Sequence, residues 1–221
     1  MTAPFVNIHT HKAQGTGIEL VNCDIADSSP TEIFASAGLH PWNIEKCNPL
    51  QMLEKLDKWC DEKLICAIGE IGIDRCIKTD IDTQKEIFAK QLAMAEMHNL
   101  PAVIHCVKAF SDIIQIIKEK KVTIPLIFHS FNGNATIIKQ LEQSNCFYSF
   151  GKQLIDNRKI QSLLTLAPMS RLFFETDIAD ISICNIYNFA SESLNIGIDE
   201  LKQTTFDNLI NIFGDKWTTV G

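Results

Sequence analysis

Short β-branched or aromatic runs alternate with longer amphipathic stretches from residue 64 onward, and this alternation restricts the fold more than any other feature. The five runs occupy residues 64–68, 102–105, 126–129, 146–150 and 172–175. Their starts lie 38, 24, 20 and 26 residues apart, and each interval can hold one crossover helix. The pattern is typical of βα units whose strands form a parallel sheet.

Helix start signals fall between these runs. Asn48 and Pro49 are an N-cap and first-turn pair for a helix that reaches Lys63. Thr83 and Glu86 have the spacing of a capping box, for a helix that ends near residue 98. Further helices are expected over residues 109–120, 134–143, 156–166, 186–194 and 199–213.

The first sixty residues contain three more strand candidates, at residues 5–9, 18–23 and 33–37. Eight parallel strands predict an α/β fold of the (β/α)8 TIM-barrel type. The gaps at residues 12–17 and 25–31 are too short for a usual crossover helix of about 10 residues or more. We therefore predict a barrel with a shortened N-terminal part that lacks one or two outer helices, and one domain over residues 1–221.

Charge and composition narrow the functional classes. The 221 residues include 46% hydrophobic and 21% charged side chains, which is ordinary for a globular protein. The formal net charge of −7 repels polyanions, so a protein that coats nucleic acid with its whole surface is excluded. An enzyme that meets one phosphate through metal ions does not need a basic surface.

The cysteines and the N-terminal residues bear on location. Eight cysteines are scattered along the chain without a C-x-x-C pair, which excludes a zinc ribbon or a thioredoxin motif. The N-terminal segment lacks a basic region followed by a long apolar stretch, and no apolar run approaches the ~20 residues that span a bilayer. We expect a cytoplasmic protein without a membrane segment.

Potential metal ligands stand at the predicted strand ends. They are His9, His11, Glu70, His105, His129 and Asp177. Histidines at i and i+2 of a strand project to the same face, so His9 and His11 can grip one ion. Since the carboxyl ends of barrel strands meet at one mouth, ligands remote in sequence are expected to converge. Glu70 is placed to bridge two ions, and Asp177 to bind metal and accept a proton from water.

Each of these residues also has an ordinary interpretation. The His-x-His pair could donate to backbone carbonyls, and either His105 or His129 could be a hydrogen-bonded core histidine. Asp177 could be an N-cap. An unpaired Glu70 among apolar neighbours would be costly, which favours a functional role. His40 follows the third strand and either supports the ligands or faces the substrate.

Taken together, the motifs resemble the TatD family of metal-dependent hydrolases. The matching blocks are residues 7–11 (Asn-Ile-His-Thr-His), 37–41 (Ala-Gly-Leu-His-Pro), 68–74 (Ile-Gly-Glu-Ile-Gly-Ile-Asp), 101–105 (Pro-Ala-Val-Ile-His), 128–133 (Phe-His-Ser-Phe-Asn-Gly) and 174–177 (Phe-Glu-Thr-Asp), with a tail at 204–213. The resemblance implies a two-metal centre of zinc, magnesium or manganese on the six ligands named above. It also implies hydrolysis of DNA phosphodiesters, as an exonuclease or a less specific deoxyribonuclease.

The chain departs from the family pattern around the substrate. Where the family usually carries an arginine two residues after the fifth-strand histidine, this chain has Val107, followed by Lys108. Lysine offers a point charge rather than a bidentate clamp for phosphate. Arg75 stands where the family often has an aromatic residue. We predict that His40, Arg75 and Lys108 contact the substrate.

Three functional hypotheses follow. The first is a metal-dependent deoxyribonuclease, in which two metals activate a water, Glu70 holds the metals and Asp177 orients or deprotonates the water. The second keeps the metals but takes an amide, lactone or other carbonyl substrate, which the missing clamp and the acidic charge favour. The third is a metal-stabilised scaffold that binds a partner or a second copy of itself through the incompletely covered barrel side.

Overall fold

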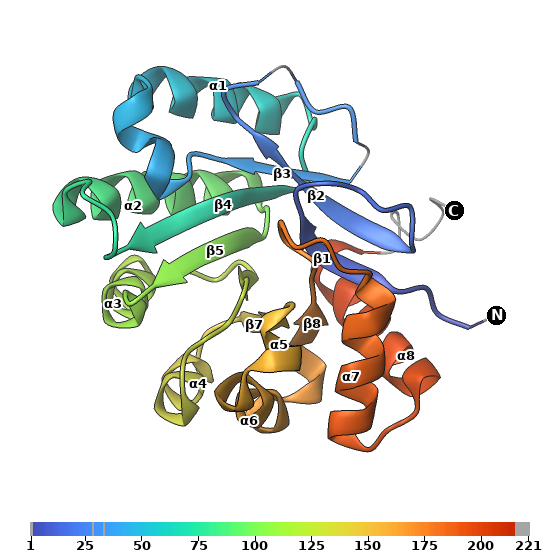
Figure 1. Cartoon of the computed structure of the whole chain (residues 1–221). Helices are drawn as coiled ribbons and strands as arrows, with labels where there is room; N and C mark the ends of the chain where they lie inside the picture. The colour runs from blue at the N-terminus through green and yellow to red at the C-terminus, as the bar shows by residue number, and fades with distance from the viewer. Residues whose placement is uncertain (1, 28, 33, 215–221) are drawn as a thin grey trace. The chain divides into compact units, whose positions relative to one another are not determined.

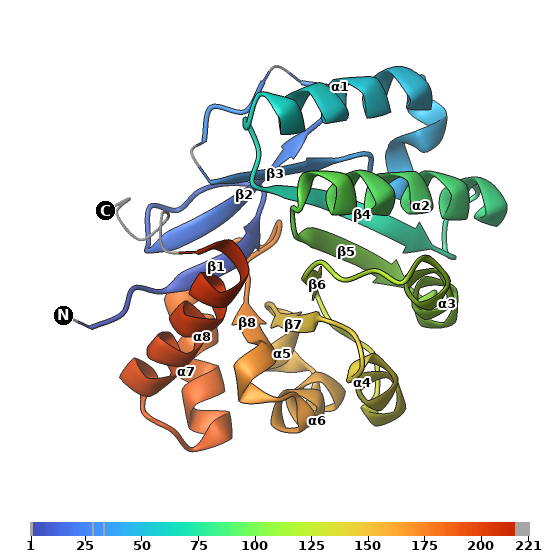
Figure 2. The same ribbon diagram turned by 180° about the vertical axis from the view of Figure 1, so that it is seen from behind.

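The computed structural model describes residues 2–27, 29–32 and 34–214. The chain forms two compact units. Unit 1 comprises residues 1–21, 129–139 and 147–221, and unit 2 comprises residues 22–128 and 140–146. Strands and helices alternate along most of the chain (Figures 1 and 2), and the eight strands follow one another in sheet order.

Unit 2 contains the central parallel strands. These are β3 (Ala35–Gly38), β4 (Ala67–Asp74), β5 (Ala102–Val107) and β6 (Leu126–Phe128). Ala102 pairs with Ile68 on one side and with Leu126 on the other, so the three strands are in parallel register. Every residue of β4 is buried. Such continuous burial is what helices on a parallel sheet produce.

The helices of unit 2 are α1 (Pro49–Asp61), α2 (Ile81–His98) and α3 (Phe110–Lys120). The side chain of Asn48 accepts hydrogen bonds from the first turn of α1, as predicted. The predicted capping box of α2 is wrong, because Asp80 accepts from the backbone N–H of Thr83 at 2.9 Å and caps the helix three residues earlier. Figures 1 and 2 both show α2 running alongside β4.

The predicted strand at residues 64–68 starts too early. The backbone N–H of Leu64 donates a hydrogen bond to the carbonyl of Trp59 in α1. The strand β4 begins only at Ala67 and continues to Asp74. Two glycines inside the strand hide its length in the sequence. A Cβ on Gly69 would lie 2.5 Å from the Cβ of Val103, so glycine is required where β4 approaches β5. Glu70 therefore lies within a strand, not at its end.

Unit 1 contains the first and last strands. They are β1 (Val6–Thr10), the first four residues of β2 (Ile18–Asp24), β7 (Cys146–Phe150) from its second residue, and β8 (Leu172–Phe174). Val6 pairs with Ile18, and Phe150 with Phe174, both in parallel. Directly after β8, the backbone of Asp177 exchanges hydrogen bonds with His9 and His11.

The helices of unit 1 are α5 (Gln153–Asp156), α6 (Arg158–Leu166), α7 (Ile183–Leu194) and α8 (Ile198–Phe213). The predicted start at residue 156 is wrong, because Asn157 caps α6 and a separate short turn precedes it. The buried Tyr187 hydroxyl of α7 donates to the carbonyl of Val6 at 2.9 Å and bonds to Thr205 of α8. Figures 1 and 2 show α7 and α8 side by side.

The remaining elements are the helix α4 (Ala135–Leu141) and the 3-10 helices η1 (Pro41–Lys46) and η2 (Met169–Arg171). Among the described residues no helix separates β1 from β2, or β2 from β3, as the short gaps predict. The predicted third strand begins at Ile33, which lies outside the described residues. In the same described part of the chain, no helix is long and apolar enough to cross a membrane.

Candidate metal centre

Three of the predicted ligands lie together in unit 1. Nε2 of His9 is 3.5 Å from Oδ1 of Asp177, and Nε2 of His11 is 3.4 Å from the same oxygen. The ligand atoms of all three lie within 4.8 Å of one another. The backbone holds the group, since the N–H of Asp177 donates to His9 and the N–H of His11 donates to Asp177. We call these three residues the unit 1 group.

His129 lies next to this group, where β6 ends. Its ring centroid is 4.7 Å from that of His9. Its Nδ1 is 3.6 Å from Oε1 of the buried Glu175, which also accepts from the backbone N–H and the hydroxyl of Ser130 at 2.7 and 2.8 Å. A carboxylate behind one ring nitrogen orients the other nitrogen toward a metal. The sequence reasoning assigned no role to Glu175, although it belongs to the Phe-Glu-Thr-Asp block.

Unit 2 holds a second cluster, formed by His40, Glu70 and His105 and named here the unit 2 group. Nδ1 of His105 is 2.8 Å from Oε1 of Glu70, and Nε2 of His40 is 3.3 Å from the same oxygen. Their ligand atoms also lie within 4.8 Å of one another. The side chain of Glu70 is 6% exposed and that of His105 is 9% exposed. The buried carboxylate is therefore paired, as the cost of burying it requires.

The tautomer of His40 follows from its own hydrogen bonds. Its Nδ1 accepts from the backbone N–H of Trp42 at 3.1 Å and so caps η1. A ring nitrogen that accepts carries no proton, so the neutral imidazole has its proton on Nε2, which faces Glu70. In this arrangement His40 donates to Glu70. The geometry favours a role in holding the carboxylate over a role as a ligand.

Asp74, at the end of β4, extends the unit 2 group. Its Oδ2 accepts from the indole N–H of Trp42 at 2.7 Å and lies 3.4 Å from Nε2 of His105, and its Oδ1 accepts from the N–H of Cys76. Burial raises the pKa of Asp74, but the hydrogen bonds from Trp42, Cys76 and His105 outweigh it and hold the pKa below its usual value. An aspartate at the end of an apolar strand was a signal in the sequence that our predictions did not use.

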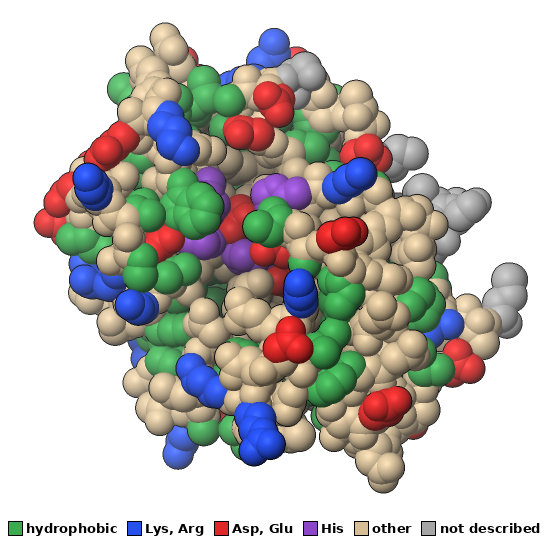
Figure 3. Space-filling view, in the orientation of Figure 1, with side chains coloured by type: hydrophobic (Ala, Val, Ile, Leu, Met, Phe, Trp, Pro, Cys, Tyr) green, Lys and Arg blue, Asp and Glu red, His purple; other side chains and the backbone are tan. Residues whose placement is uncertain are grey.

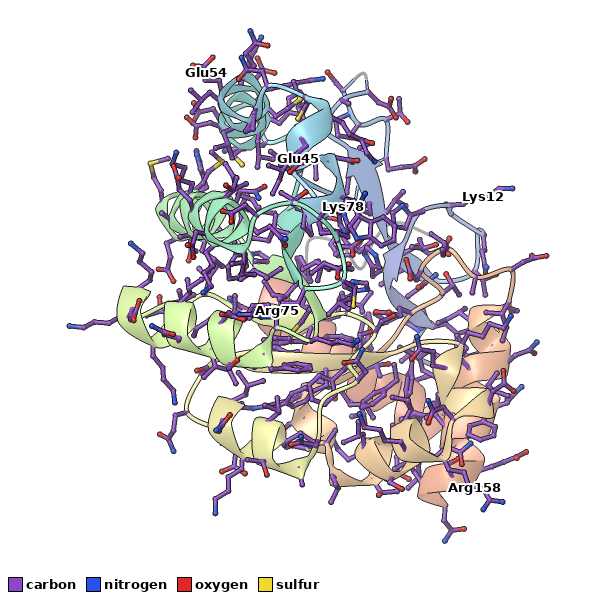
Figure 4. All side chains as sticks on the ribbon, turned by 60° about the vertical axis from the view of Figure 1, so that its left-hand side comes forward. Lys12, Glu45, Glu54, Arg75, Lys78 and Arg158 are labelled. Atoms are coloured by element: carbon purple, nitrogen blue, oxygen red, sulfur yellow. The ribbon has the colours of Figure 1, made fainter. Side chains whose placement is uncertain are left out.

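All three predicted substrate contacts lie in unit 2, and besides His40 these are Arg75 and Lys108. Arg75 donates from Nε and Nη2 to the carboxylate of Asp112 at 2.7 and 2.9 Å, and Lys85 bonds to the same group. Figure 4 shows Arg75 beside α3, the helix that carries Asp112. A phosphate would have to compete with Asp112 for this guanidinium. Lys108 is exposed just after β5, in a left-handed conformation with φ of 53°.

A pocket of about 520 Å³ opens beside the unit 1 group. Its wall includes Ser130, Gly151, Lys152, Asn157, Asp177 and Ile178. Lys152 and Asp177 therefore border one cavity, which the sequence did not predict. Acidic and basic side chains are interspersed over the face drawn in Figure 3.

The donor chemistry of both groups fits a divalent metal ion. Imidazole nitrogens and carboxylate oxygens in one compact set are the usual ligands of zinc and related ions in catalytic sites. Four of the six predicted ligands belong to unit 1 and two, Glu70 and His105, belong to unit 2. Each unit thus carries a His–carboxylate group of its own.

Parallel βα units with such groups on or just after their strands define a metal-dependent hydrolase of the (β/α)8 type. The chain belongs to the TatD family, since the family model described as TatD related DNase matches residues 6–214. The solved structure of YJJV, a TatD homologue from Escherichia coli, covers 96% of this chain and 99% of its own at a TM-score of 0.82 and 20% identity. This likeness confirms the predicted fold class.

Curated relatives are similar over most of this chain. The uncharacterized metal-dependent hydrolase YabD of Bacillus subtilis is 30% identical over 193 residues, which are 81% of this chain and 74% of that protein. The 3'-5' ssDNA/RNA exonuclease TatD of Pectobacterium carotovorum is 27% identical over 159 residues. That match spans 69% of this chain and 60% of the exonuclease.

Proposed function

We propose that this chain is a divalent-metal-dependent phosphodiesterase that cleaves DNA, and that residues 1–221 form one hydrolase domain. The family model spans parts of both units, which supports a single domain. The observation that carries the proposal is the unit 1 group, in which two imidazoles and one carboxylate present their ligand atoms within 4.8 Å. Relatives named as exonucleases support the choice of a phosphodiester.

The proposed ligands are those that the sequence indicates: His9, His11, Glu70, His105, His129 and Asp177. In this proposal two divalent ions, of zinc, magnesium or manganese, are bound, and the histidine-rich set favours zinc or manganese over magnesium. Such ions, when bound, lower the pKa of water and offset the negative charge that develops on phosphate. The bridging of two ions by Glu70 stays a prediction.

The side chains of the protein supply positioning and proton transfer. Asp177 is partly exposed and borders the pocket, so its carboxylate can accept a proton from the attacking water. Lys152 borders the same pocket and can take a phosphate oxygen. Glu175 orients His129, and His40 holds Glu70.

A carbonyl substrate is the second candidate. It is favoured by the absence of the family arginine at Val107 and by the engagement of Arg75 with Asp112. Because Arg75 is engaged with Asp112, a neutral amide or lactone would be bound as readily as a phosphodiester. The predicted substrate contacts of His40, Arg75 and Lys108 belong to both candidates.

The direct test is a substrate panel with controlled metal. Protein stripped with EDTA is reloaded with manganese, cobalt or zinc and offered single-stranded DNA, bis(p-nitrophenyl) phosphate and a set of amides and lactones. We expect hydrolysis of DNA that depends on added metal. Turnover of carbonyl substrates alone would replace the first candidate with the second.

Two further predictions concern the cellular location and the oligomeric state. Eight cysteines are present as free thiols, which supports a reducing cytoplasm as the place of action. Self-association through the side with short connections stays a prediction, and light scattering at high concentration tests it. A strict monomer would contradict it.

A further inference from the structure

Trp42 is exposed to solvent and yet fixed in place. The residue is 55% exposed. Its indole N–H donates to Asp74 at 2.7 Å, and its ring stands edge-on to that of His40, with centroids 5.0 Å apart and an interplanar angle of 86°. The centroid of His105 is 6.0 Å away. An aromatic ring therefore lies at the border of the unit 2 group with much of its surface in water.

Single exposed apolar side chains are common on protein surfaces, and Trp42 differs in that its exposed ring is held in place by a hydrogen bond. Among the described residues five large hydrophobic side chains are exposed, namely Trp42, Leu50, Met97, Leu166 and Ile178. Trp42 is the aromatic one of these five. The hydrogen bond to the charged acceptor Asp74 prevents the indole from folding back over apolar neighbours. The ring is thus held ready for contact at little further cost in conformational entropy.

We propose that Trp42, at the border of the unit 2 group, is a stacking platform for a base of the substrate. This inference rests on the proposed function and deepens it, because it names a side chain that contacts the bases of a single-stranded substrate. Aromatic side chains bind unpaired bases by stacking on their π-faces, with little sequence preference. A base inside a duplex has no free face to offer.

The charge of the protein supports stacking as a source of affinity. With a net charge of −7 the chain gains little from neutralising phosphates at long range. Arg75, close to the unit 2 group in sequence, is bound to Asp112. A neutral contact with the bases then contributes binding that salt does not screen. We expect binding of single strands to depend weakly on salt.

The kinetic test compares two single-stranded 12-mers with manganese present, one of thymidylate and one fully abasic. The wild-type protein should favour the thymidylate oligomer in kcat/KM by about 5- to 150-fold, the range that one stacked base supplies. Trp42→Ala should abolish most of that preference, mainly through KM. Trp42→Phe keeps an aromatic ring and should retain most of it. Leu50→Ala, which removes an exposed apolar side chain of α1, should behave as wild type.

A structural role for Trp42 would have a different result. If Trp42 acts only through its hydrogen bond to Asp74, both Trp42→Ala and Trp42→Phe should lower kcat/KM by the same factor for the two oligomers. The preference for the thymidylate oligomer would then stay as in the wild type. That outcome would overturn the proposal. An equal kcat/KM for both oligomers in the wild type would overturn it as well.

A binding measurement separates this inference from the proposed function. Tryptophan emission of an Asp177→Asn variant is titrated with each oligomer, and the emission of Asp177→Asn with Trp42→Phe is the background. We expect the thymidylate oligomer to quench the Trp42 contribution and the abasic oligomer to leave it unchanged. If the wild type hydrolyses neither oligomer, the proposed function is wrong, while quenching still decides whether bases stack on Trp42.

Discussion

The two His–carboxylate groups differ in how the chain builds them. The unit 1 group comes from the end of one strand and a neighbouring segment bonded to it by backbone hydrogen bonds, and its side chains His11 and Asp177 are 39% and 28% exposed. In the unit 2 group, side chains from β4, β5 and the cap of η1 meet in the interior, and Glu70 is 6% exposed. We propose from this comparison that the unit 1 group meets the reacting water, whereas the unit 2 group also stabilises the fold.

The largest expected effect is on catalysis through the open group. Asp177→Asn removes the carboxylate that we propose accepts the proton, and it should lower kcat by about 100- to 10,000-fold. The nearby Asp180→Asn, an exposed change of the same chemistry, should leave kcat within a factor of two. Steady-state hydrolysis of single-stranded DNA measures both. An equal loss of kcat in the two variants would contradict a specific catalytic role for Asp177.

A second prediction concerns the stability of the metal-free protein. Glu70→Ala leaves His40 and His105 without their shared acceptor in a buried place, so the free energy of unfolding should fall by about 1–3 kcal/mol. Asp177→Ala, in the open group, should change it by less than about 1 kcal/mol. Urea unfolding of EDTA-treated protein gives both values. A larger loss of unfolding free energy in Asp177→Ala than in Glu70→Ala would contradict the structural role of the unit 2 group.

The smallest expected effect tests whether Arg75, which follows β4, has a structural role. The guanidinium of Arg75 and then the ammonium of Lys85, working against burial, lower the pKa of Asp112 to about 2. Because the folded pKa lies below the unfolded value, the ionised carboxylate stabilises the fold above about pH 4, and this contribution is lost as the pH falls through about 2.

Asp112→Asn should therefore reduce the free energy of unfolding by about 1 kcal/mol at pH 7, since the pair is partly exposed to solvent. The difference from wild type should shrink as the pH falls toward 2. Unfolding by urea at a series of pH values checks this. A difference that is constant with pH would mean that packing, and not the ion pair, explains the loss.

The fold was predictable where the sequence pattern is local. Alternating strands and helices after residue 64, the cap at Asn48 and the missing early helices all follow from periodicity and turn chemistry. The bounds of β4 were not, because Gly69 reads as a strand breaker unless the approach of Val103 is known. The start of α2 was missed because Asp80 is a better acceptor for the first turn than Thr83.

The candidate site could be proposed from residue type, whereas its contacts could not be predicted from the sequence. Histidines and carboxylates at strand ends stand out in a sequence. Which ring nitrogen of His40 carries the proton cannot be predicted from the sequence, because it depends on the hydrogen bond from the backbone N–H of Trp42. The partners of Arg75 and His129 come from Asp112 and Glu175, 37 and 46 residues away, and only the folded chain brings them together. Contacts across such distances are set by packing and not by motif.

The most direct test of the central claim is a crystal grown with Mn²⁺ and measured for anomalous scattering. We predict a peak at the unit 1 group, at about 2.0–2.3 Å from Nε2 of His9, Nε2 of His11 and the carboxylate of Asp177. Metal-dependent hydrolysis of DNA by the same protein would accompany it. A crystal grown with saturating Mn²⁺ that shows no anomalous density at these three side chains would contradict the account.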